Sequence, residues 1–225
     1  MVRERSRRIE DYALIGDCES AALVGTDGSI DWLCLPRFDS PACFASLLGT
    51  RDHGSFVVAP RDASARVTRS YRDGTLILET RFDTSEGVVT VVDFMPLRAQ
   101  RADVVRIVRG DRGDVPMTLE LTPRFDYGFM SPWVSAVEGG ALAMGGPDVL
   151  RLATDVPLEL SDDAIRGAFL VREGTETTMS LRWSASHHEM PPIGDARCAL
   201  EDTARFWSDW SRRCRFEGPY RDAVV

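Results

Sequence analysis

The sequence of 225 residues contains no lysine, so all 27 of its basic residues are arginines. This absence excludes a lysine nucleophile or a Schiff base as the source of any chemistry. Acidic residues outnumber the arginines and give a formal net charge of -8. Because phosphates require a basic surface, this charge argues against a nucleic-acid partner. We attribute the arginine bias to coding preference rather than to function.

Histidine is also scarce, with His53, His187 and His188 the three examples. Adjacent histidines in an extended segment tend to point in opposite directions, and no third ligand stands at a metal-like spacing. Gly-x-Ser-x-Gly elbows and glycine-rich phosphate loops followed by lysine are missing as well. The sequence therefore predicts no metal site and no cofactor.

The five cysteines form no Cys-x-x-Cys pair and are odd in number. We expect a reduced, cytoplasmic protein in which the thiols are small core residues. No apolar run approaches the ~20 residues that span a bilayer, and the charged N-terminal segment has no apolar stretch behind it. These features predict neither a membrane partner nor a secretory signal.

Short alternating segments separated by turns such as Asp73-Gly74 and Glu86-Gly87 fill most of the chain. Strands about every 8 to 12 residues are typical of an antiparallel β-sandwich, so the fold class is mainly β. We also predict a turn over 111–114. The predicted strands cover 21–24, 29–35, 55–59, 66–71, 75–82, 88–95, 104–108, 117–121, 149–153, 164–171 and 177–184.

Two helices interrupt this pattern. Ser40, followed by Pro41, is typical of a helix start, which predicts a short helix near residue 44 that ends at Gly49. A second, linker helix is predicted from Ala196 to about Arg213, because apolar and aromatic residues recur there at steps of three and four. The predicted face contains Leu200, Thr203, Trp207, Trp210 and Cys214.

The stretch from Asp17 to Gly49 organises the chain. Strict alternation over residues 29–35 predicts Ile30, Trp32 and Cys34 on one face and Asp31, Leu33 and Leu35 on the other. Pro36-Arg37-Phe38-Asp39 follows directly. Such a loop, with a charged pair around an aromatic ring, suggests a functional contact.

These residues resemble the N-terminal domain of bacterial and archaeal glycoside hydrolase family 15, the glucoamylase-like and trehalase-like enzymes. The resemblance starts with the run from Ile9 to Gly49 and continues through Asp93-Phe94-Met95-Pro96. It includes Pro123-Arg124-Phe125-Asp126-Tyr127-Gly128, Trp207-Ser208-Asp209-Trp210 and Gly218-Pro219-Tyr220-Arg221-Asp222-Ala223-Val224. It therefore spans nearly the whole chain in the family's order.

The resemblance implies a β-supersandwich over residues 1–190, followed by a linker helix and the start of an (α/α)6 catalytic barrel over 191–225. The catalytic carboxylates of the family match nothing in this sequence, so no catalytic residue is assigned. It further implies a hydrolase in carbohydrate metabolism whose barrel partner acts on an α-glucoside, trehalose or a maltooligosaccharide, with inversion. The sequence does not choose between these substrates.

Inverting hydrolysis needs two carboxyl groups roughly 6.5 to 9.5 Å apart. Asp31 and Asp39 are the most suggestive pair, but turn and capping bonds account for both. The fragment alone is therefore expected to be inactive.

The candidate site is the loop formed by Trp32, Pro36, Arg37, Phe38 and Asp39. Aromatic rings stack on sugars, and an Arg–carboxylate pair can hydrogen-bond several hydroxyls. The loop could therefore close one side of a glucose pocket in the barrel, or it could simply bind the barrel as an interface. Alternatives for the whole domain are a carbohydrate-binding module and a purely structural assembly domain. The face that would contact the barrel also predicts some tendency to form homo-oligomers.

Overall fold

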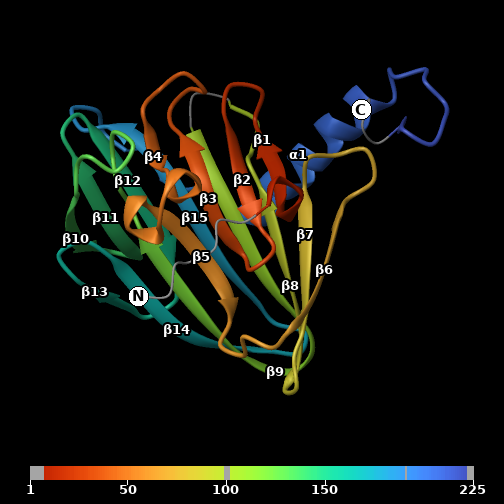
Figure 1. Cartoon of the computed structure of the whole chain (residues 1–225), viewed down its shortest axis with the longest axis horizontal. Coiled ribbons are helices and arrows are strands. Elements are labelled where there is room, and N and C mark those ends of the chain that lie inside the picture. Colours follow the sequence, from red (N-terminus) through yellow and green to blue (C-terminus); the bar gives the residue numbers. More distant parts are fainter. Residues whose placement is uncertain (1–7, 99–101, 191, 222–225) are drawn as a thin grey trace.

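The computed structural model describes residues 8–98, 102–190 and 192–221. Antiparallel strands dominate this part of the chain (Figure 1). The strands are β1 (Tyr12–Gly16), β2 (Ala21–Gly25), β3 (Ser29–Cys34), β4 (Ala42–Phe44), β5 (Ser55–Pro60), β6 (Arg66–Tyr71), β7 (Leu78–Asp83), β8 (Gly87–Phe94), β9 (Ala102–Thr122), β10 (Trp133–Val137), β11 (Gly140–Gly145), β12 (Asp148–Thr154), β13 (Leu158–Leu160), β14 (Ile165–Arg172) and β15 (Glu176–Ala185). The remaining elements are 3-10 turns at Ile9–Asp11, Ser46–Leu48 and Arg51–His53 and the helix α1 (Ala196–Ser211).

The long strand β9 belongs to both layers of the fold. Its residues 102–113 pair with β15 and β8, whereas residues 114–122 pair with β14 and β5. The first layer therefore contains β1 to β5, β13 and β14, and the second contains β6 to β8, β10 to β12 and β15. Side chains from both layers form one buried core that includes Phe56, Val91 and Leu181. The predicted mainly β, antiparallel sandwich is confirmed.

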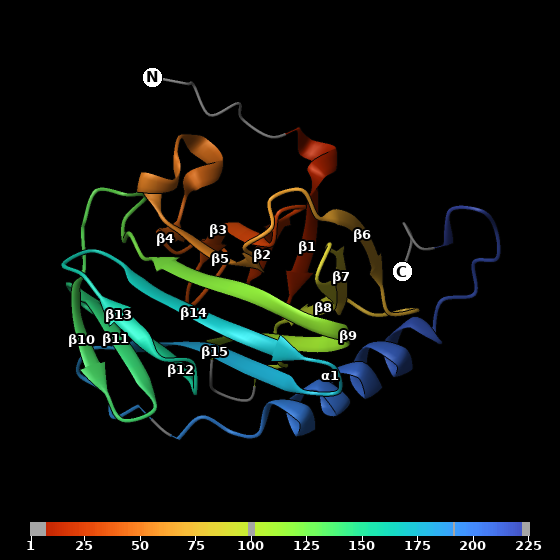
Figure 2. The ribbon, with the colours of Figure 1, turned by 90° about the horizontal axis from the view of Figure 1, so that it is seen from below.

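The helix α1 covers part of the outer side of the second layer (Figure 2). Leu200 and neighbouring alanines of α1 pack on Val92, Phe94 and Ile107 of β8 and β9. Asp195 caps the helix, because its Oδ1 accepts the backbone N–H of Cys198 at 2.8 Å. The segment before the helix is held by Arg182 of β15, which donates to the carbonyl oxygen of Pro192.

The predicted short helix near residue 44 is wrong. Residues Ala42–Phe44 form β4, which pairs with β3, and only a single 3-10 turn follows at Ser46–Leu48. Ser40 does not cap a helix, since its Oγ accepts the backbone N–H of Arg37 at 3.1 Å. A short apolar run fits a strand or a helix equally well, and here pairing with β3 decides for the strand and buries Phe44 completely.

Two further details differ from the sequence predictions. The turn predicted at 111–114 lies inside β9, which continues through it with Gly113 at a φ of 66°. The strict alternation predicted for 29–35 fails because Asp31 is an extra residue in the pairing of β3 with β2. Ile30 and Leu33 therefore both face the core, while Trp32 and Cys34 lie on the opposite face with Ala42.

Candidate functional site

Hydrogen bonds to its backbone anchor the loop that joins β3 to β4. Arg98 donates to the carbonyl oxygen of Pro36 and, at 2.9 and 3.1 Å, to a carboxylate oxygen of Asp17, which is itself fully buried. The Phe38 N–H donates to the carbonyl oxygen of Glu19 at 2.9 Å. The Leu35–Pro36 peptide bond is cis. The loop is therefore anchored to the β1–β2 turn and to the segment after β8.

The three side chains beyond Pro36 extend away from these anchors. Phe38 is 66% exposed, and Arg37 Nε donates to Asp39 Oδ1 at 2.9 Å across the exposed surface. This hydrogen bond holds the pKa of the Asp39 carboxyl below its usual value and raises the pKa of Arg37. Phe38 is therefore displayed beside a guanidinium–carboxylate pair that remains charged at neutral pH.

A second segment, the turn over residues 125–130, lies beside β4. The Phe125 and Met130 backbones bond to each other, and the Tyr127 N–H donates to the carbonyl oxygen of Ala42 at 3.1 Å. Asp126 and Tyr127 both have left-handed backbones, with φ of 52° and 57°, and Gly128 follows at 95°. Non-glycine residues in this region are strained, and such strain is concentrated at functional sites.

The turn exposes two aromatic side chains, and one of them lies next to β3. Tyr127 is 47% exposed, and its ring centroid lies 6.1 Å from that of the half-buried Trp32 on β3. Phe129 is 87% exposed. We call this region the loop-end surface, defined as Trp32, Arg37, Phe38, Asp39, Tyr127 and Phe129. Of the predicted site residues, Trp32 thus lies next to a turn whose two exposed aromatic residues the sequence did not assign to the site.

The sequence contains a repeated motif that points to this second segment. Residues 123–126 repeat the Pro-Arg-Phe-Asp of residues 36–39, but here the arginine and the phenylalanine are buried. Arg124 is buried and donates to Asp163 Oδ2 at 2.8 Å, and Phe125 is 4% exposed. Tyr127 and Phe129, just beyond this repeat, are the exposed aromatic residues of this segment.

The two carboxylates suggested by the sequence serve other purposes. Asp31 is buried and accepts hydrogen bonds from the Tyr12 hydroxyl and from Ser46 Oγ, both at 2.9 Å. Asp39 is exposed and paired with Arg37. Their environments agree with structural roles rather than with an acid–base pair.

Within residues 8–98, 102–190 and 192–221, no group of three or more His, Cys, Asp or Glu side chains could hold a metal ion. The prediction that His187 and His188 point apart is wrong, because they lie in a turn after β15 with ring centroids 4.2 Å apart.

The five cysteines are free thiols. Cys34 and Cys43 are buried as expected, and burial raises the pKa of both, but Cys18 and Cys198 are exposed. None of the described helices is long and apolar enough to cross a membrane.

Comparisons with known proteins identify relatives over nearly the whole chain. The trehalase of Mycolicibacterium smegmatis is 30% identical over 229 aligned residues, which cover 90% of this chain and 34% of that protein. The trehalase of Mycobacterium tuberculosis is also 30% identical, with 33% of its length covered. The trehalase of Thermoplasma volcanium is 25% identical over 97% of this chain. The chain thus spans about a third of the length of these curated relatives.

A solved structure of a bacterial glucoamylase complexed with acarbose has a similar fold. Its TM-score is 0.61 at 10% sequence identity, and the match covers 92% of this chain and 38% of that one. This likeness concerns the fold alone. The family described as "Trehalase-like, N-terminal" matches residues 1–196. The chain therefore belongs to the family of trehalase-like N-terminal domains.

Proposed function

We propose that this chain is the non-catalytic N-terminal domain of an inverting α-glucoside hydrolase, with trehalose or a maltooligosaccharide as the substrate. The observation that carries this proposal is the family match, together with relatives named trehalase that are about three times as long. The acid and base of the reaction would lie in a downstream (α/α)6 domain. The domain itself would extend over residues 1–190, with a linker from 191.

We further propose that the loop-end surface contacts this catalytic domain and forms one wall of its glucose pocket. The backbone anchors at Arg98 and Glu19 keep the loop in place, and the left-handed turn displays Tyr127. Aromatic rings beside an ion pair match the mixed apolar and hydroxylated surface of a sugar. A contact that only binds the two domains together would also use exposed aromatic rings, so the two roles need an experiment.

The experiment uses the protein that carries this chain together with its catalytic domain. Tyr127→Ala and the double variant Arg37→Ala/Asp39→Ala would be assayed with trehalose and with maltotriose, and the Tm of each would be measured. If the surface forms a pocket wall, kcat/KM falls at least tenfold at unchanged Tm. If it only joins the domains, the Tm falls and kcat/KM of the folded fraction is unchanged.

A matched control is the exposed pair of Arg166 and Glu120, which lie opposite each other on β14 and β9. Arg166→Ala should leave both the activity and the Tm unchanged. Wild-type values of kcat/KM and Tm in all loop-end variants would refute both proposed roles. Hydrolysis of either sugar by the 225-residue chain alone would refute the non-catalytic assignment.

The cellular setting is part of the same proposal. All five cysteines are free thiols, as expected in the reducing cytoplasm, where we place the protein. The exposed aromatic residues of the loop-end surface would also favour self-association of the isolated domain.

A further inference from the structure

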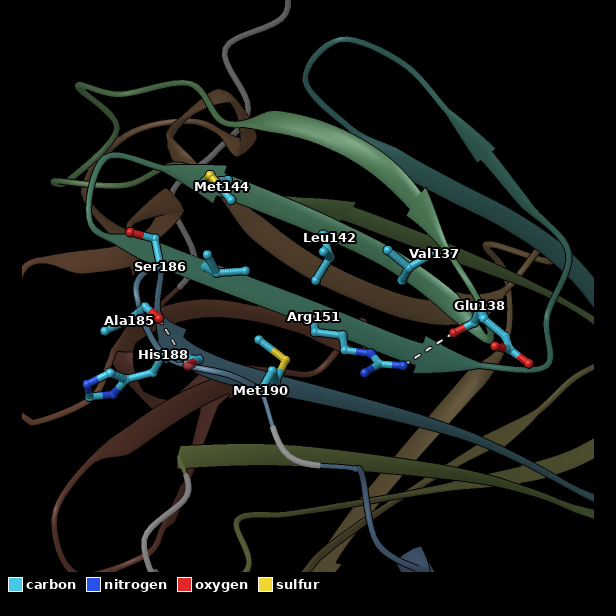
Figure 3. A pocket seen from close by; sticks show the side chains of 11 residues that line it. Val137, Glu138, Leu142, Met144, Arg151, Ala185, Ser186, His188 and Met190 are labelled. Atoms are coloured by element: carbon cyan, nitrogen blue, oxygen red, sulfur yellow. Dashed lines mark hydrogen bonds between the residues drawn. The ribbon is translucent and has the colours of Figure 1, made fainter.

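A groove of about 370 Å³ lies on the outer side of the second layer, over β11 and β12 (Figure 3). Leu142 and Met144 of β11 and Val149 of β12 contribute apolar side chains, and Met190 lies opposite them in the segment after β15. We call this hollow the outer-face groove. Its volume is within the roughly 300–1,000 Å³ that is usual for small-ligand sites, and most of its lining comes from rigid strands.

The strand register places a tryptophan beside Met144, which is one of the residues that line this groove. Trp133 of β10 lies directly opposite Met144 of β11, which lies opposite Val149 of β12. Directly opposed side chains share one face of a sheet, and the next residue, Val134, packs against the core. The Trp133 indole therefore lies on the outer face beside Met144. It is 72% exposed, so one ring face is free to contact a ligand.

Arg151 supplies hydrogen-bond donors in the groove. Its Nη2 donates to the carbonyl oxygen of Glu138 at 3.3 Å, as Figure 3 shows. Its Nε is buried and lacks a hydrogen-bond partner among the described residues. A ligand in the groove does not reach this buried Nε, but Arg151 lines the groove and its guanidinium has further N–H donors for a ligand oxygen.

The charge of the groove restricts the kind of ligand. Glu138 and Arg151 contribute one acidic and one basic side chain, and the opposite wall contains Ser184, Ser186 and His188. Hydroxyl and imidazole groups both donate and accept hydrogen bonds. A site with nearly balanced charge, several polar groups and an exposed indole suits a neutral molecule that has both an apolar face and many hydroxyls.

We infer that the outer-face groove binds a short neutral saccharide. In this arrangement one sugar ring stacks on Trp133, and a ring or hydroxyl oxygen accepts a hydrogen bond from Arg151. The groove specifies a neutral saccharide, while the choice of α-glucosides as first probes rests on the proposed function. Through this site the domain would hold an oligosaccharide on the outer face of the second layer.

The test is calorimetric titration of the 225-residue chain with maltotriose and trehalose, and with cellotriose as a saccharide of another linkage. Trp133→Ala should lower the association constant at least tenfold, while Trp133→Phe, which keeps a ring, should retain most of the binding. Arg151→Met keeps the aliphatic stem but removes all donors, and it should also weaken binding at least fivefold. Thermal unfolding of each variant checks that the fold is retained.

Arg166→Ala, which breaks the exposed pair with Glu120 across β14 and β9, is the control and should leave binding unchanged. Absence of binding to all three sugars at tens of millimolar would overturn the inference. Binding that is lost in Tyr127→Ala but kept in Trp133→Ala would overturn it as well, and would instead favour a sugar contact at the loop-end surface. Binding of cellotriose alone, abolished by Trp133→Ala, would support the groove while contradicting the α-glucoside part of the proposed function.

Discussion

A buried ion pair between Arg106 and Asp93 connects the two layers of the sandwich. The two residues lie directly opposite each other on β9 and β8, and both side chains are completely buried. Arg106 donates two hydrogen bonds to Asp93, at 2.8 and 3.1 Å. It also donates to the carbonyl oxygens of Phe56 and Gly28 in the other layer, both at 2.8 Å. Asp93 therefore neutralises the buried guanidinium, and the two carbonyl oxygens accept hydrogen bonds from it.

Asp93→Asn removes the negative charge and keeps the shape. The guanidinium then remains in the core without a counter-charge, and breaking a buried pair in this way costs about 3–5 kcal/mol. For a domain of this size each kcal/mol lowers the Tm by about 2–4 °C, so the Tm should fall by about 6–20 °C. The pair Arg166 and Glu120 also lies directly opposed across two strands, but it is exposed, and Arg166→Ala should cost about 0–1 kcal/mol.

Chemical denaturation and calorimetry of the 225-residue chain would measure both variants. Adding Arg106→Met to Asp93→Asn removes the stranded charge, so the double variant should be less destabilised than the sum of the two single variants. If Asp93→Asn cost less than about 1 kcal/mol, or if the two changes were additive, the pair would not be acting as an interdependent buried unit. The assignment of Arg106 as the link between the layers would then be wrong.

Other predictions concern α1 and the state of assembly. Trp207→Ala should destabilise the domain by about 3–5 kcal/mol because that ring is 8% exposed, whereas Trp210→Ala, at a 43% exposed position, should cost much less in the same denaturation assay. Asp195→Ala should lower the Tm by removing the helix cap, while Asp202→Ala on the exposed side should not. The backbone hydrogen bond from Cys198 holds the pKa of Asp195 below its ordinary value of about 3.9. The stabilisation by the cap is therefore complete above pH ~3.9 and is lost as the pH falls through the lowered pKa of the folded state. Sedimentation at increasing concentration should show self-association, and a strictly monomeric profile would contradict it.

Much of the fold was predictable because strands and turns have local signals. The alternation over Arg66–Tyr71 and the glycine turn at Asp73-Gly74 lead directly to β6 and its hairpin. The helical period from Ala196 also gave the correct type and start of α1, although the helix ends at Ser211 rather than near Arg213. Trp210 was placed on the packed face by spacing alone, but that position is largely exposed because α1 packs mainly through Leu200, Thr203 and Trp207.

The errors occur where pairing between distant segments decides the local structure. Ala42–Phe44 is a strand because β3 offers a partner, and no local pattern reports that partner. Asp31 is an extra residue in β3, so Ile30 lies on the same face as Leu33 and not on the face of Trp32. The continuity of β9 through residues 111–114 likewise depends on bonds to four other strands.

The two Pro-Arg-Phe-Asp segments illustrate why the site could only be half predicted. In residues 36–39 the arginine finds its carboxylate within the segment, at Asp39, and the loop can stay exposed. In residues 123–126 the arginine instead reaches Asp163, between β13 and β14, and this pairing draws Arg124 and Phe125 inward. The arginine and the phenylalanine are thus exposed in one segment and buried in the other, and the two arginines differ in whether their carboxylate partner is local or distant. Tyr127 lies just beyond this buried pair of residues, and its ring lies 6.1 Å from that of Trp32, so a strained turn beside a distant ion pair completes the surface that the local pattern only began.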